Sequence, residues 1–163
     1  MPPKTDSEVR KPRAFDKTKY ELKYLRFLGE FMTAAGLTTT TAGEKIGISQ
    51  VSIYYWLKKD DAHIATVMKL IEACGYRMEI SLVPEEQDND GFSIELRPSR
   101  SDRRLSFLAD ALKDVDKEEL AAKIGMGYST IYYWLKHDDM YISYIYRIAE
   151  AIGRKVKITI RPQ

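Results

Sequence analysis

The amino-acid sequence predicts a mainly α-helical protein with a small antiparallel sheet, built from two copies of one helical module. The first observation is a repeat, since residues 53–58 read IYYWLK and the same letters return at 131–136, 78 positions later. The second is the apolar period, which is helical through most of each copy and alternates near its end. The third is the placement of Gly47 and Gly125, each of which separates two short helical stretches.

The repeat covers most of the chain. At the offset of 78 it runs without a gap from Lys45/Lys123 to Pro84/Pro162, and 17 of those 40 pairs are identical. Upstream the offset becomes 80, so the first copy carries two extra residues near positions 36–41, a change that a loop tolerates. The sequence therefore divides into a basic arm, a first module with its strand, an acidic turn with a linking strand, and a second module with its strand: 1–16, 17–84, 85–100 and 101–163.

Composition excludes several classes of protein. The chain has 163 residues and no apolar run near the ~20 residues of a membrane span, and its N-terminus lacks a secretory signal. Cys74 is the only cysteine and there are two histidines, which favours a reducing, cytoplasmic compartment and argues against a zinc site. No Ser/His/Asp set, phosphate loop or catalytic carboxylate pair is present. We therefore expect no enzyme, no metal and no cofactor.

Charge is unevenly distributed behind a net value of +2. Residues 1–26 hold eight Lys/Arg against four Asp/Glu, while residues 85–99 hold five acids against Arg97. Residues 1–16 are polar and rich in proline, and we expect them to be disordered. Two interpretations stay open for them: an untethered tail, or an arm that contacts DNA phosphates or the minor groove through Arg10, Lys11 and Arg13.

The helical elements of the first copy follow from its apolar stripes and caps. A first helix is expected from about 17 to 35, with Leu25, Leu28 and Met32 on one face. Thr38 can cap a second helix over about 39–46, and Ser49 a third over about 50–58. Asp60 and Asp61 stand before a fourth helix that carries an apolar face over 64–71, where acids suit both the cap and the helix dipole. Metal binding by these acids is the weaker interpretation.

Strands follow the fourth helix. Met78, Ile80 and Leu82 alternate with polar residues, and a second alternating stretch at 92–97 predicts a β-hairpin with a long acidic tip. The second copy repeats the plan, with helices over about 102–113, 117–124, 128–136 and 141–152, the second of which Asp116 can cap. Its strand lies at about 155–161. We expect one antiparallel sheet made of 77–83, 92–97 and 155–161, with Glu79 and Glu95 opposite Lys155, Lys157 and Arg161.

A short helix, a glycine turn and a second short helix form the helix-turn-helix plan. The major groove of DNA is about 12 Å wide and admits one helix, which the preceding helix braces. The two helices touch only where residues are small, and Gly43 and Ala121 meet that need. Ile53 and Ile131, with Trp56 and Trp134, are expected to face inward, and Cys74 to be a core thiol.

The segment Lys117–Gly125 (KEELAAKIG), followed by MGYSTI at 126–131, resembles the lambda-repressor-like, or XRE/Cro, helix-turn-helix family. The ending IAEAIGRKVKITIRP at 148–162 is similar to the helix-plus-strand tail of many small members, antitoxins among them. The resemblance covers about 22–84 and 104–162, and it implies two lambda-repressor-like modules related by internal duplication. The first copy departs from the pattern, with Ala42-Gly43 in place of Leu-Ala and threonines at 38–41 in place of a polar and acidic opening.

The resemblance implies which residues contact DNA. In that family, bases are contacted from the start of the third helix and one turn further on, here Gln50, Val51 and Tyr55, then Tyr128, Ser129 and Tyr133. Phosphates are held near the start of the second helix and by the cap of the third, here Thr39, Lys117, and Ser49 or Gly127. The outward faces also carry Ser52, Lys58, Thr130 and Lys136. Tyr54 and Tyr132 stay open between packing on the fourth helix and touching phosphate.

Two histidines have simple interpretations. His63 is expected to be a solvated residue at a helix start. His137 is expected in a loop, where a phosphate contact is the minor alternative.

These features together predict a sequence-specific regulator of transcription that binds double-stranded DNA, a repressor of phage type, active in the cytoplasm on the nucleoid. The duplication supplies two reading helices on one chain, so we expect a pseudo-dimeric monomer on an approximately palindromic site, with higher assembly still open. Two alternatives remain: an antitoxin that binds a toxin and represses its own operon, and a protein-interaction scaffold derived from the same fold.

Overall fold

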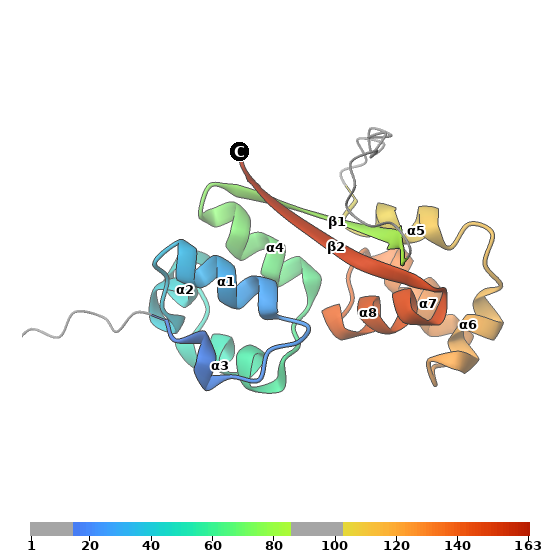
Figure 1. Ribbon diagram of the computed structural model, residues 1–163, viewed down its shortest axis with the longest axis horizontal. Coiled ribbons are helices and arrows are strands. Elements are labelled where there is room, and N and C mark those ends of the chain that lie inside the picture. The colour runs from blue at the N-terminus through green and yellow to red at the C-terminus, as the bar shows by residue number, and fades with distance from the viewer. Residues whose placement is uncertain (1–14, 86–102) are drawn as a thin grey trace, which may run out of the picture. The chain divides into compact units, whose positions relative to one another are not determined.

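The computed structural model describes residues 15–85 and 103–163 (Figure 1). Over these ranges the chain is mainly helical with one two-stranded antiparallel sheet, which confirms the predicted class of a mainly helical protein with a small antiparallel sheet. Contacts divide the chain into two compact units, Met1–Asp60 and Asp61–Gln163. The boundary falls before the fourth helix of the first copy, so that helix and its strand belong to the second unit. Arg10, Lys11, Arg13 and the expected strand at 92–97 lie outside the described residues.

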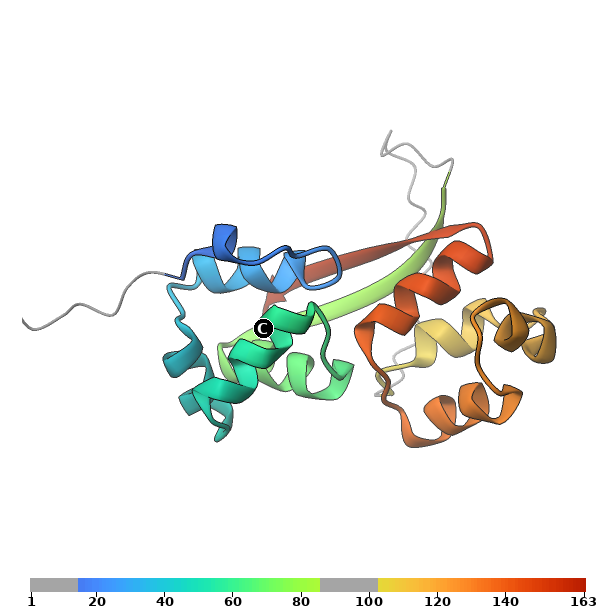
Figure 2. The ribbon, with the colours of Figure 1, turned by 90° about the horizontal axis from the view of Figure 1, so that it is seen from below.

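The first unit contains one short 3-10 helix and three α-helices: η1 (Lys17–Lys19), α1 (Arg26–Ala34), α2 (Thr39–Ile46) and α3 (Gln50–Lys59). The predicted stripe of Leu25, Leu28 and Met32 is fully buried and forms the centre of this unit. Figure 2 shows η1 alongside α1, and the two elements are in contact.

The first helix is shorter than predicted, because residues 17–25 do not continue it. Tyr20 is extended, with φ −124° and ψ 141°, and it ends η1. The N–H groups of Lys23, Tyr24 and Leu25 donate to the Asp60 carboxylate at 2.9–3.0 Å instead of to helical carbonyls. Phe15 and Asp16, expected in the disordered arm, are placed here: Phe15 stacks on Tyr20, and Asp16 accepts the N–H of Thr18.

The helix pair α2–α3 begins at the predicted caps. Thr38 and Thr41 form a capping box, and the Ser49 hydroxyl accepts the N–H of Ser52 at 3.2 Å. Gly47 ends α2 in the left-handed region at φ 72°, where a side chain is strained. A Cβ added to Gly43 would lie 2.5 Å from the Ile48 carbonyl oxygen, so only glycine fits this approach of the chain after α2.

The second unit contains five helices and two strands among its described residues: α4 (Ile64–Ala73), β1 (Tyr76–Pro84), α5 (Ser106–Ala111), α6 (Lys117–Lys123), α7 (Tyr128–His137), α8 (Ile142–Ala151) and β2 (Arg154–Pro162). Asp116 caps α6 as predicted, accepting the N–H groups of Glu118 and Glu119. The helix α5 is shorter than predicted, and Asp138 accepts the N–H groups of Arg104 and Leu105 just before it starts. No helix within the described ranges is long and apolar enough to cross a membrane.

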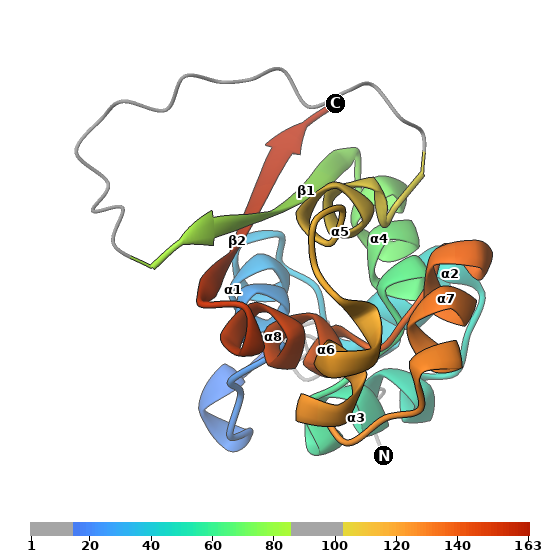
Figure 3. The same cartoon turned by 90° about the vertical axis from the view of Figure 1, so that its right-hand side faces the viewer.

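The strands β1 and β2 form an antiparallel pair centred on Ile80 and Ile158. Met78, Ile80 and Leu82 are buried, as their alternation predicted, whereas the apolar residues of β2 are half-buried. The helices α4 and α8 pack near the strands that follow them, and Figure 3 shows α5 beside β1. The first copy's strand is thus covered in part by a helix of the second copy.

The predicted charge pairing across the sheet is diagonal at Glu79, because Arg161 and Lys157 lie opposite its same-face neighbours Arg77 and Ser81. In the register of the sheet Glu79 lies opposite Thr159, not opposite a cation. Its carboxylate forms an ion pair with Arg77 of the same strand at 3.7 Å. Alternate residues of one strand share a face, so this neighbour competes with a partner across the sheet. Glu95 lies outside the described residues.

The fourth helices are capped across the repeat and not by the acids that precede them, which corrects the expected role of Asp60 and Asp61. His63 stands at the N-cap of α4 and makes no side-chain cap bond. Asp139 instead accepts the N–H of Ala65 in α4 at 3.0 Å, and Asp61 accepts that of Ser143 in α8 at 3.0 Å. The His63 ring nitrogen also lies 3.3 Å from the Asp139 carboxylate, and the ring lies tilted against Tyr141 with 4.0 Å between ring centres.

Candidate nucleic-acid interface

Exposed apolar and aromatic side chains of the described residues gather on α3 and α7. Seven large ones are at least 43% exposed, and six of these seven belong to these two helices: Val51, Tyr54, Tyr55, Tyr128, Tyr132 and Tyr133. The inward faces carry Ile53 and Ile131, both fully buried, as predicted. Because exposed aromatic patches mark binding surfaces, the outward faces of α3 and α7 are the candidate interface.

The first residue of α3, Gln50, has its side chain oriented by a hydrogen bond from α2. The Gln50 side chain accepts a hydrogen bond from the Thr40 hydroxyl, which lies on α2, at 2.5 Å. This bond occupies one lone pair of the amide oxygen and leaves the amide NH2 exposed to solvent. Val51 is 51% exposed beside it, and Ser52 is half-buried and shares the Ser49 cap. The start of α3 thus presents the NH2 donor and the second acceptor lone pair of the Gln50 amide, together with one apolar group.

Tyr54 packs on the segment that precedes α1. Its ring meets the edge of Tyr20 at 6.2 Å and that of Tyr55 at 5.9 Å, and it stays 43% exposed. Burial raises the pKa of the Tyr20 phenol, and the neighbouring Tyr54 adds to the rise. The sequence left Tyr54 open between packing on the fourth helix and touching phosphate. The observed geometry keeps its ring at the surface, where a bound molecule can reach it.

The face of α7 has a different flank. Tyr132 meets the edge of Tyr128 at 6.1 Å, and the Lys117 ammonium lies 5.9 Å from the Tyr132 ring centre. Lys117 is half-buried and also donates to the Leu112 carbonyl at 3.3 Å. A cation held over a tyrosine ring is attracted by the ring's negative face. The two contacts therefore restrain the Lys117 side chain more than that of an exposed surface lysine.

The other flank of α7 contains two pairs of aromatic rings in contact. Tyr133 is 60% exposed and lies 4.1 Å from the His137 ring, which belongs to the last turn of α7 and not to a loop as expected. Trp134 is 7% exposed and stacks on Tyr144, which agrees with its expected core role. Its counterpart Trp56 is half-buried, as is Cys74, so these two are less enclosed than predicted.

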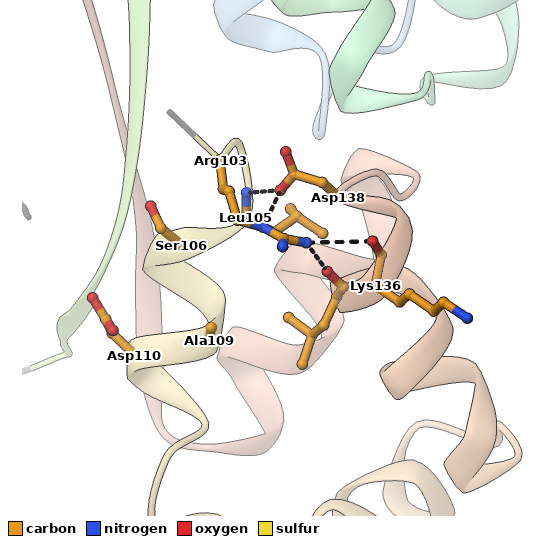
Figure 4. Close-up of a pocket in the computed structure, with 8 residues that line it drawn as sticks. Arg103, Leu105, Ser106, Ala109, Asp110, Lys136 and Asp138 are labelled. Carbon is orange, nitrogen blue, oxygen red and sulfur yellow. Dashed lines mark hydrogen bonds and ion pairs between the residues drawn. The ribbon is translucent and has the colours of Figure 1, made fainter. Parts of the chain in front are cut away.

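The C-terminal ends of α3 and α7 are fixed by equivalent aspartates. Asp60 and Asp138 adopt left-handed backbone angles, with φ 57° and 56°, and each accepts N–H groups that precede the first helix of its copy. Figure 4 shows this arrangement after α7, in a cleft of about 560 Å³. There the Arg103 guanidinium donates to the Leu135 carbonyl, and Asp138 lies beside Arg103. These bonds attach the end of α3 to the start of α1, and the end of α7 to the start of α5.

The two helices are basic. Neither α3 nor α7 contains an acidic residue, while α3 ends on Lys58 and Lys59 and α7 on Lys136 and His137. The lysines are exposed. An anionic partner is favoured over a cationic one by this composition. Among the described residues no group of three His, Cys, Asp or Glu is arranged to hold a metal ion.

The structure brings the predicted residues together in two sets, one in each unit. The first set lies on α2, α3 and the cap between them: Thr39, Ser49, Gln50, Val51, Ser52, Tyr54, Tyr55 and Lys58. The second set lies on α6 and α7: Lys117, Tyr128, Ser129, Thr130, Tyr132, Tyr133 and Lys136. The sequence analysis did not predict the Thr40–Gln50 and Tyr20–Tyr54 contacts, because each joins residues ten or more positions apart.

A scan against protein-family models matches no family, and searches of curated proteins and of solved structures also give no match.

Proposed function

We propose that this protein binds double-stranded DNA in a sequence-specific manner, with α3 and α7 as reading helices in the major groove, and that it regulates transcription. The observation that carries the proposal is the concentration of exposed aromatic and basic side chains, without any carboxylate, on these two helices. An isolated aromatic patch would serve a protein partner equally well. The lysines on the same helices favour DNA over a protein partner. So does the arrangement of two short helices joined by a turn that contains glycine.

The roles of the residues follow from their chemistry. Gln50 and Val51 at the start of α3 suit a base edge and a thymine methyl group, respectively. Tyr128 and Ser129 occupy the same positions of α7. Lys58, Lys117 and Lys136 suit phosphates, which supply affinity for any sequence.

The experiment is a binding titration with a fluorescent duplex of random sequence, repeated at several salt concentrations, followed by selection from a random duplex library. DNA binding predicts that log K falls linearly with log salt, by about 0.9 units for each phosphate neutralised. Selection should then enrich one motif. Absence of binding at low salt would overturn the proposal, and binding without an enriched motif would reduce it to non-specific binding.

A second candidate is an antitoxin that also binds a protein toxin. The exposed tyrosines favour it, because tyrosine is enriched at protein interfaces. It predicts that one strong protein partner co-purifies with the chain at high salt, where DNA binding is lost. A scaffold without DNA binding is the third alternative, and the same salt titration separates it from the other two.

The oligomeric state on DNA tests the pseudo-dimer hypothesis. Because the chain carries two candidate reading helices, we propose that one chain occupies one site. Sedimentation of the DNA complex is expected to give one protein per duplex. An obligatory ratio of two chains per duplex would contradict this hypothesis without affecting DNA binding itself.

A further inference from the structure

The segment at residues 15–25, called the strap, is packed tightly onto the first unit. A Cβ added to Gly29 of α1 would lie 2.8 Å from Leu22 Cδ1, 3.5 Å from Lys17 Cβ and 3.7 Å from Phe15 Cε1. Glycine at this position therefore lets the strap lie directly on α1. A larger residue at this position would require the end of the Leu22 side chain to move.

The strap is also attached to α3. Near its middle, the Tyr20 ring meets the edge of Tyr54 on the outward part of α3, and Phe15 stacks behind Tyr20 at 5.8 Å. At its end, the N–H groups of Lys23 and Leu25 donate to Asp60, the residue that ends α3. The strap therefore lies beside the candidate interface and is bonded to the residue that ends α3.

In the second copy, the second helix of the pair supplies a cation beside the tyrosine that corresponds to Tyr54. In that copy the Lys117 ammonium lies over Tyr132, whose position corresponds to Tyr54 at the offset of 78. The counterpart of Lys117 in the first copy is Thr39, which carries no charge. The flank of Tyr54 thus lacks a cation from α2, and the nearest element beyond Tyr54 is the strap.

Two exposed lysines stand in the strap next to this contact. Lys17 and Lys19 belong to the single turn of η1, and Lys19 immediately precedes Tyr20. The one acid in that turn's cap, Asp16, accepts the hydroxyl and the N–H of Thr18, which lower the pKa of its carboxyl, and the nearby charge of Lys19 lowers this pKa further. Glu21 is exposed on the other side of Tyr20 in the sequence. The lysine ammonium groups are left at the surface.

We propose that the strap is part of the nucleic-acid interface, and that Lys17 and Lys19 bind DNA backbone phosphates beside Tyr54, in the place that Lys117 serves for the second copy. This inference rests on the proposed DNA binding and extends its footprint. Phosphates carry no sequence information, so these lysines add affinity and leave base preference unchanged. The first copy then matches the second in charge although α2 has no lysine at its start.

The test is the salt dependence of duplex binding by the full chain carrying Lys17→Ala and Lys19→Ala. Removing two phosphate contacts is expected to lower the slope of log K against log salt by about two units. The motif enriched from a random library should not change. Lys17→Arg with Lys19→Arg is expected to keep the slope, because arginine also binds phosphate.

Lys155→Ala with Lys157→Ala on β2 is the matched control, since it removes the same charge from exposed positions outside the interface. Equal slopes for the strap variant and the wild-type chain would overturn the strap inference and leave the proposed function standing. An equal loss in the β2 control would also overturn it, because the effect would then be one of net charge. A wild-type chain that binds no DNA would overturn both.

Discussion

Ile80 pairs with Ile158 at the centre of the sheet, and the two residues hold the same position of the repeated sequence, 78 residues apart. The same relation recurs just before the two fourth helices, where His63 forms a bridge with Tyr141, also 78 positions away. When equal positions pair in an antiparallel manner, the two segments are related by an approximate two-fold axis. Within the second unit, α4 with β1 and α8 with β2 therefore meet across an approximate two-fold axis, as equivalent segments do in a symmetric dimer.

The reciprocal caps of α4 and α8 should each support the second unit. Asp139→Ala removes the acceptor of the Ala65 N–H, and Asp61→Ala removes that of the Ser143 N–H and hydroxyl. Loss of a helix cap costs about 1 kcal/mol of unfolding free energy. Denaturant unfolding should show such a loss for each variant. Asp110→Ala, which changes an exposed acid of α5, is the control, and an equal effect there would contradict the capping role.

Asp60 should stabilise the entry to α1. Asp60→Ala removes the acceptor of three N–H groups and puts alanine at φ 57°, so we expect a loss of about 2 kcal/mol in unfolding free energy. Asp60→Asn keeps an oxygen acceptor and a residue that tolerates this backbone conformation. It should therefore recover part of the loss. Chemical denaturation measures both variants, and equal losses would show that the carboxylate oxygen is not the cause.

Gly43 should resist substitution because of packing and not conformation. Gly43→Ala places a methyl group 2.5 Å from the Ile48 carbonyl oxygen, and that oxygen belongs to backbone that cannot rotate away. Although alanine favours helix, we expect a net loss of about 1–3 kcal/mol from overpacking. Thermal unfolding measures it. Glu44→Ala at the adjacent exposed position is the control, and a gain in stability for Gly43→Ala would contradict the observed approach.

Gln50 and Lys117 should affect DNA binding in different ways. Gln50→Ala is expected to cost about 1–3 kcal/mol at one base pair and to relax preference there, because we propose that its amide bonds a base edge. Lys117→Ala is expected to weaken binding to all sequences and to lower the salt slope by about one unit. Competition with specific and random duplexes distinguishes the two. An equal loss on both duplexes for Gln50→Ala would refute its role in base recognition.

The preferred DNA site should be only approximately palindromic. Ser49-Gln50-Val51-Ser52 at the start of α3 corresponds to Gly127-Tyr128-Ser129-Thr130 at the start of α7. Gln50 offers a donor and an acceptor in one plane, while Tyr128 offers one hydroxyl and an apolar ring. The half-site of α3 should thus be selected more strictly, with the half-site centres about ten base pairs apart. A fully symmetric motif would mean that two chains supply one module each.

The sequence by itself determined the helices that depend on local signals. The caps Thr38, Ser49 and Asp116 and the turn glycines Gly47 and Gly125 all act within a few residues, so each was predictable from its neighbours. The apolar periods likewise predicted the buried stripe of α1 and the inner face of β1, because burial follows the period of the backbone.

Only the tertiary structure decided where the acids and the first residues of each copy lie. Asp60, Asp61 and Asp139 bond N–H groups 35 to 82 positions away, and a carboxylate carries no local signal for a distant partner. The same long-range bonds end the helical stretch expected at 17–25, because an aspartate takes N–H groups that a helix would have used. The Thr40–Gln50 and Tyr20–Tyr54 contacts were hidden for the same reason. Chain folding, not spacing along the sequence, brings their side chains together.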